Sequence, residues 1–213
     1  MIKDVFDILV QRGDWFFQLL LEHIRISLTA IIIAGVLGLF IGIWVSGREK
    51  LASVAIGITN AAYTIPSIAL LGMLIPLLGM GDENAITTLV IYGLLPMVRN
   101  TYAGLNSIPP DIVEAARGMG STEIQIMMKI KLPLAMSIII AGVRNMVVMT
   151  IAVTTIASYV GAGGLGVAIF RGISSYNPSM TFAASIIVAL LAIICDFILG
   201  RIENHLKKER RMN

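Results

Sequence analysis

Long apolar stretches constrain this chain more than any other feature of its sequence. Of 213 residues, 57% are hydrophobic and 14% are charged, and the mean hydropathy is +0.87. A helix rises about 1.5 Å per residue, so about 20 apolar residues cross the ~30 Å hydrocarbon core of a bilayer. An all-α integral membrane protein with five transmembrane helices is therefore predicted. The five stretches are Ile24 to Val45, Leu51 to Leu78, Ala85 to Ser107, Pro133 to Val160 and Met180 to Ile202.

Small residues and prolines add detail to these spans. Ala34, Gly38 and Gly42 recur every four residues in the first span, which predicts close approach of another helix along that face. Pro66 and Pro76 lie in the second span, which predicts that it is kinked or split.

The segment before the first span mixes aromatic and aliphatic residues with charges. This composition predicts a short helix in the headgroup region, with a frayed polar lead-in as the alternative. No small-residue cleavage pattern follows the first apolar run, so we expect that span to be retained. The predicted regions are therefore an interfacial segment (1–23), a membrane domain (24–204) and a basic tail (205–213).

Loop charges predict the orientation of the chain. If the C-terminus is cytoplasmic, ten Lys and Arg residues lie inside, against Lys3, Arg12, Arg25 and Arg171 outside. The ten are Arg48, Lys50, Arg117, Lys129, Lys131, Arg201, Lys207, Lys208, Arg210 and Arg211. The N-terminus is then outside, and the polar segment 109–131 is inside.

That polar segment contains signals for two short helices. Asp111 followed by Glu114 resembles a capping box, and Gly118 and Gly120 are expected to end the first helix. Thr122 with Gln125 is a second capping signal, and residues 123–131 are expected to form a short helix leading to Pro133. Any cytoplasmic loop of this length needs caps and glycines, which is the alternative reading.

Polar residues within the spans are candidates for a translocation pathway, because charges facing lipid cost about 2.5–3.5 kcal/mol each. Two readings stay open for the charged residues: a lining of the pathway, or an ion pair in which Asp196 neutralises either arginine. The residues near Pro66 mark a helix break, read either as part of a cavity or as a packing kink. The candidates are Tyr63, Pro66, Ser67, Arg99, Asn100, Arg144, Asn145 and Asp196.

A glycine-rich run fits the dinucleotide-binding fingerprint formally. It comprises Gly161, Gly163, Gly164 and Gly166, but it lies between two spans, and no acidic residue follows from 161 to 194. We expect a tight re-entrant turn on the outer face instead.

One motif resembles that of a known family. Glu114-Ala115-Ala116, three residues, Gly120, nine residues, Ile130, one residue and Leu132-Pro133 is similar to the cytoplasmic coupling segment of the membrane subunits of ATP-binding-cassette importers. YTIPSIALLGMLIPLLG, VRNTYAGL and IASYVGAGGLGVAIFRGI resemble permease subunits of osmoprotectant importers, and the resemblance covers about residues 20 to 204.

The resemblance implies a type I importer permease fold in the plasma membrane of a prokaryote. It implies two permease subunits, identical or homologous, with ATPase subunits that bind ATP and Mg beneath them. Glu114, Ala115, Ala116 and Gly120 would contact the ATPase. An extracellular binding protein would deliver glycine betaine, carnitine or choline near the glycine-rich turn, holding the trimethylammonium group in an aromatic cage.

This chain itself shows no nucleophile–base pair, metal cluster or nucleotide loop, so no catalysis and no bound cofactor are expected. A methionine or other amino-acid importer permease is one alternative. Another is a stand-alone secondary transporter that uses Arg99, Arg144 and Asp196 as an ion relay.

Overall fold

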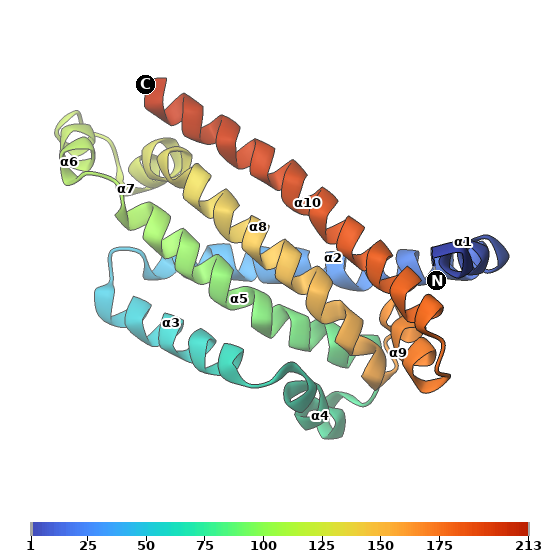
Figure 1. Ribbon diagram of the computed structural model, residues 1–213. Coiled ribbons are helices and arrows are strands. Elements are labelled where there is room, and N and C mark those ends of the chain that lie inside the picture. The colour runs from blue at the N-terminus through green and yellow to red at the C-terminus, as the bar shows by residue number, and fades with distance from the viewer. Residues whose placement is uncertain (1, 213) are drawn as a thin grey trace.

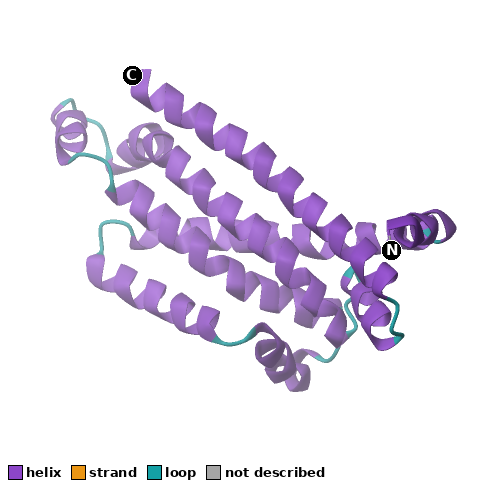
Figure 2. Ribbon diagram, viewed as in Figure 1, coloured by secondary structure: helices purple, strands orange, loops and turns teal. Residues whose placement is uncertain are grey.

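The computed structural model describes residues 2–212, with side chains described from 3 to 208, and this range is helical without strands (Figure 2). The side chains of Arg210 and Arg211, in the predicted basic tail, lie outside the described part. The α-helices are α1 (Ile2–Gln11), α2 (Gly13–Val45), α3 (Glu49–Thr64), α4 (Ser67–Leu78), α5 (Asp82–Asn106), α6 (Pro110–Gly118), α7 (Glu123–Ile126), α8 (Leu132–Ala157), α9 (Gly166–Ser174) and α10 (Pro178–Met212). A π-helical turn, Met127–Lys131, joins α7 to α8, and a 3₁₀ turn, Ser158–Val160, follows α8.

The long helices form a bundle with two distinct ends (Figure 1). α1, α4 and α9 lie at one end, and α6, the α2–α3 connection and the C-terminus lie at the other. The loops that the sequence predicts to be cytoplasmic are therefore gathered at a single end.

The helices α2 and α5 touch along the predicted small-residue stripe. A Cβ at Gly38 would lie 2.6 Å from Met97 Cβ, and one at Gly42 would lie 2.5 Å from Thr101 Cβ. Such distances are too short for real Cβ contacts, so these positions accommodate only glycine without movement of the helices. The predicted close approach is confirmed, and its partner is α5.

Within the part of the chain that the structure describes, three helical segments are long and apolar enough to cross a membrane: Gly13–Val45, Glu123–Val160 and Pro178–Lys208. α3 and α4 make a fourth if counted as one span, and they are bent by 98° at their break, so the predicted split is confirmed. α5 does not meet this test. It packs against α2, α3, α4 and α8, and a helix shielded from lipid by its neighbours does not need a uniformly apolar surface.

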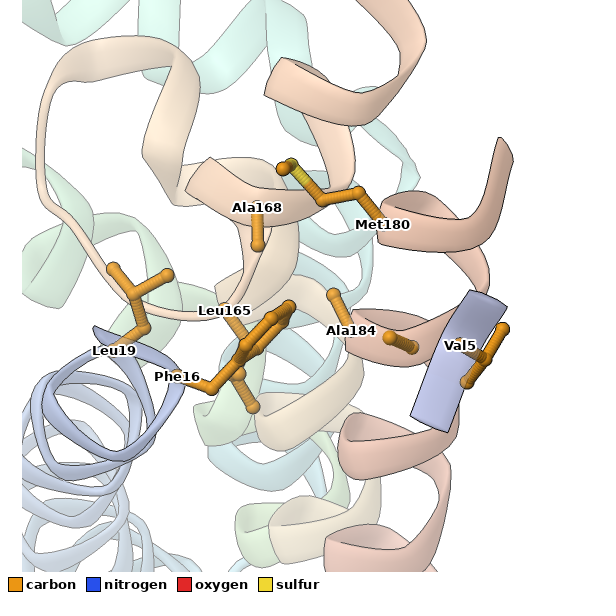
Figure 3. Close-up of a cluster of buried hydrophobic side chains, with 8 residues drawn as sticks. Val5, Phe16, Leu19, Leu165, Ala168, Met180 and Ala184 are labelled. Carbon is orange, nitrogen blue, oxygen red and sulfur yellow. The ribbon is translucent and has the colours of Figure 1, made fainter. Parts of the chain in front are cut away.

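The first spanning helix begins earlier than the sequence predicts. The predicted interfacial segment covers residues 1–23. α1 ends at Gln11, and α2 already begins at Gly13, so residues 13–23 belong to the first long helix. Phe16 and Leu19 are 3% and 5% exposed and pack in a cluster with Leu165 and Ala168 of the α9 region (Figure 3). Burial of these apolar side chains against a distant part of the chain stabilises the first turns of α2. The helix therefore begins before its most hydrophobic stretch.

Candidate functional site

The polar segment after α5 folds as a helix, a glycine corner and a second helix (Figure 1). α6 ends at Gly118, and Gly120 has a φ of 83°, where an L side chain is strained. Asp111 does not cap α6, so the capping box predicted there is wrong. Pro109 is the N-cap residue, and Pro110 opens the first turn, which needs no N–H donor.

The second capping signal is confirmed. The Gln125 N–H donates to Thr122 Oγ1 over 3.3 Å, and the Thr122 N–H donates to Gln125 Oε1 over 2.8 Å. The helix from 123 to 131 is not separate, because the π-helical turn carries it into α8. The turn ends at Lys131, two residues before Pro133, whose missing N–H and ring disturb regular α-helical bonding in the preceding turn.

The predicted coupling residues differ in their exposure. Glu114, Ala115 and Gly120 are exposed, but Ala116 is buried, with only 2% of its surface exposed. Ala116 therefore cannot present its side chain to a partner in this conformation. A Cβ at Gly120 would meet nothing within 4 Å, so its backbone conformation, rather than close approach, is what requires glycine.

Apolar side chains that are not among the predicted site residues surround this corner. Ile112, Met119, Ile124 and Met128 are 41%, 80%, 77% and 61% exposed. Ile112 lies on α6, and Met119 directly follows this helix. Ile124 and Met128 lie on α7 and the π-helical turn. The sequence predicts that this whole segment lies outside the membrane, where water rather than lipid would meet it. Exposed apolar groups of this kind mark interaction surfaces, and methionine adapts readily to a partner. In the sequence, large apolar residues within the otherwise polar segment 109–131 are the pattern that could have indicated this surface.

Four of the predicted pathway residues meet in one cavity between α3, α5 and α8. Tyr63, Arg99, Asn100 and Asn145 line a space of about 490 Å³. Arg99 is exposed and has no ion-pair partner among the described side chains. The cavity therefore combines a positive charge, two amides and one aromatic ring, which can bind a small polar or anionic group.

Arg144 and Asp196 are separate from this cavity and join α8 to α10. Arg144 Nε donates to Asp196 Oδ1 over 2.6 Å, and Nη2 donates to Oδ2 over 2.8 Å. Nη1 also donates to Glu203 Oε2 over 3.2 Å, and Glu203 accepts from Lys207. Of the two readings for these charges, the ion pair between helices is the one that the contacts support, with Arg144 as the partner of Asp196. Glu203 was missed because it lies just beyond the last predicted span.

The α3–α4 break is closed by a side chain from α5. The Tyr92 hydroxyl donates to the carbonyl of Ile65, and the rings of Tyr63 and Tyr92 meet edge to face at 5.6 Å. This carbonyl is one that the break removes from helical bonding, so Tyr92 satisfies it. Ile65 and Pro66 form the break itself, and Ser67 is the first residue of α4. Of the candidates Tyr63, Pro66 and Ser67, Tyr63 lines the cavity.

Three glycines of the glycine-rich run form the predicted tight turn, and the fourth, Gly166, begins α9. The place of this turn on the outer face stays a prediction. Gly161, Gly163 and Gly164 have φ values of 77°, 81° and 79°. The Gly164 N–H donates to Glu22 Oε2 over 3.0 Å, and a Cβ at Gly163 would lie 2.5 Å from that oxygen. The turn is therefore bound to α2 at the end of the bundle that carries α1 and α9.

Comparison with known proteins identifies the class to which this fold belongs. Residues 34–208 match the family described as binding-protein-dependent transport system inner membrane component, and the chain belongs to this family. The resemblance drawn from its coupling motif is thereby confirmed.

Its relatives are permease subunits. The chain is 40% identical over 185 residues to the carnitine transport permease protein OpuCB of Listeria monocytogenes, covering 87% of this chain and 85% of that protein. It is 36% identical to the osmoprotectant import permease protein OsmW of Salmonella typhimurium, covering 94% and 95%.

Solved structures share its fold. An inward-facing structure of the MetNI methionine ABC transporter matches with a TM-score of 0.82 at 24% identity, covering 90% of this chain and 95% of that chain. A structure of an amino acid ABC transporter matches with a TM-score of 0.72 at 20% identity, covering 94% and 96%.

Proposed function

We propose that this chain is the membrane-spanning permease subunit of an ATP-driven importer for quaternary-amine osmoprotectants of the glycine betaine, carnitine and choline type. The observation that carries the proposal is the 34–40% identity to permeases of such importers over most of the chain. An extracellular binding protein delivers the substrate, and a second permease, identical or homologous, completes the pathway.

The coupling function is assigned to the corner between α6 and α7. Glu114, Ala115 and Gly120 are exposed there beside Met119 and Ile124, which supports a docking surface with a charged edge and an apolar centre. The partner ATPase binds ATP and Mg, and its closure pushes this corner as a rigid body. This chain transmits that movement and forms the pathway, and it performs no covalent step.

The cavity between α3, α5 and α8 is proposed as part of the pathway. Arg99 with the amides of Asn100 and Asn145 suits the carboxylate of glycine betaine or carnitine. Choline has no carboxylate and carries only positive charge, so this cavity favours the first two substrates. ATP binding and hydrolysis expose the cavity to either side of the membrane in turn.

We propose five spans, in which α5 and the bent α3–α4 pair join the three apolar segments. The packing of α5 among the other long helices supports this. The N-terminus lies outside and the C-terminus in the cytoplasm of a prokaryotic cell, as the loop charges indicate.

The test is uptake of labelled substrate by vesicles that contain the permease, its ATPase and its binding protein. ATP-dependent uptake of glycine betaine or carnitine, unaffected by excess methionine, is expected. Uptake of methionine instead would establish the amino-acid importer alternative. The solved structures of amino-acid transporters support that alternative only through their similar fold. Ion-driven uptake by this chain alone, without ATP, would establish a secondary transporter and refute the proposal.

A further inference from the structure

Residues of α1, α2, the joint between them and α9 line a polar hollow. α1 and α9 lie at the end of the bundle opposite α6 (Figure 1). The volume of the hollow is about 450 Å³, and its lining includes Val10, Arg12, Asp14, Trp15 and Arg171. None of these residues takes part in the coupling corner or the cavity described above. The size falls within the range of sites that hold a small molecule or a headgroup.

The hollow has an excess of positive charge. Neither Arg12 nor Arg171 has a carboxylate partner among the described side chains, and the two guanidinium groups outnumber the one carboxylate, that of Asp14. Both arginines are exposed, so their side chains can reach a ligand. A guanidinium group binds phosphate through paired N–H donors, and this hollow presents two of them.

An aromatic wall holds one arginine in place. The guanidinium carbon of Arg171 lies 5.2 Å from the centre of the Trp15 ring, a cation–π contact. Trp15 meets Phe16 edge to face at 5.3 Å, and Phe16 is 3% exposed in the cluster of Figure 3. The wall is therefore fixed to the core, and tryptophan is a residue typical of the membrane boundary.

The helices α1 and α2 carry exposed apolar side chains at and near the hollow. Val10 lines the hollow and is 67% exposed. Phe6 on α1 and Phe17 in the first turns of α2, the two helices that contribute to the hollow, are 66% and 59% exposed. A ligand that combines a phosphate group with hydrocarbon chains would use both the charged hollow and these apolar side chains. Inorganic phosphate would use the hollow alone.

We propose that this hollow binds the phosphate group of an anionic phospholipid in the leaflet at this end of the bundle. Arg12 and Arg171 bind the phosphate, Trp15 forms the wall, and the exposed side chains of α1 contact the acyl chains. The chain thereby carries a lipid site in addition to its transport function.

The test uses the two tryptophans of the chain, which lie at opposite ends of α2. W44F leaves Trp15 as the reporter, and Trp44 is 57% exposed, so its replacement leaves the core intact. The full chain is placed in phosphatidylcholine vesicles with a small fraction of brominated phosphatidylglycerol or brominated phosphatidylcholine. Stronger quenching of Trp15 by the anionic lipid is expected.

Removal of the guanidinium groups should strongly reduce this preference for the anionic lipid. In R12Q/R171Q the preference should fall by about fivefold per arginine, the usual contribution of one basic residue at a membrane surface. R12K/R171K should keep part of it. As the matched control, W15F leaves Trp44 as the reporter beside Arg48, whose guanidinium carbon is 5.8 Å from that ring. R12Q/R171Q should not change quenching there.

Three results would overturn the proposal. The first is equal quenching of Trp15 by the two brominated lipids. The second is a preference that survives R12Q/R171Q in protein of unchanged helical content by circular dichroism. The third is loss of the preference on adding millimolar inorganic phosphate, which would assign the hollow to free phosphate instead.

Discussion

The close contact between α2 and α5 predicts that a methyl group added at Gly42 destabilises the protein. In G42A the new methyl group would lie 2.5 Å from Thr101 Cβ and 3.2 Å from the carbonyl oxygen of Val98. Neither atom can rotate away, because the backbone fixes the position of a Cβ and the other atom belongs to the backbone itself. The two helices must therefore separate by about 1 Å to restore van der Waals distances.

Two opposing effects set the size of the change. Alanine favours helix over glycine by about 1 kcal/mol, whereas overpacking of a tight contact costs about 1–3 kcal/mol. We expect a net destabilisation of up to about 2 kcal/mol, and for a chain of this size each kcal/mol corresponds to about 2–4 °C in Tm. The assay is thermal unfolding of the purified protein in detergent, followed by intrinsic fluorescence.

G35A on the same helix is the matched control. Its methyl group would meet only the Met146 methyl carbon at 3.5 Å, an ordinary contact with the end of a flexible side chain. G35A gains the helix propensity without the clash, so its Tm should stay the same or rise. If G42A proves as stable as G35A, the close approach of α2 and α5 is not what determines the cost.

Three further predictions concern the corner, the charges and the helix break. G120A should weaken recovery of the ATPase with the permease in pull-down assays, since φ at this position disfavours alanine, whereas G118A should not; equal recovery would contradict the role of the corner. R99Q should lower uptake without changing Tm, whereas D196N should lower Tm because it removes the partner of an interhelical arginine; the reverse pattern would exchange their roles. Y92F should cost about 1 kcal/mol by leaving the carbonyl at the α3–α4 break unpaired, and an unchanged Tm would show that water replaces the hydroxyl.

Local chemistry explains why some features could be predicted from the sequence. The capping box of Thr122 and Gln125 involves residues three apart, and the corner at Gly120 depends on one backbone angle. Both depend on neighbours along the chain, so their signals are complete in a short window. The tight turn of the glycine-rich run could be predicted from its own residues and from its place between two spans.

Other features depend on partners that are distant in the sequence. The start of α2 at Gly13 reflects packing of Phe16 and Leu19 against the α9 region, and residues close to Gly13 in the sequence do not indicate this packing. Arg99 and Arg144 are similar as sequence features, yet one lines a cavity and the other binds Asp196. Which side of its helix each arginine occupies, relative to the rest of the bundle, decides between these outcomes.

The sequence by itself determined that this chain crosses a membrane, that its polar segment forms a capped corner, and that it resembles importer permeases. These conclusions follow from desolvation and local backbone preferences, which act on residues close together in the chain. Only the tertiary structure decided which charges pair, where α2 begins, and that Arg12, Trp15 and Arg171 share one hollow. Those outcomes depend on contacts between helices far apart in sequence, and their geometry is set by packing of the whole bundle.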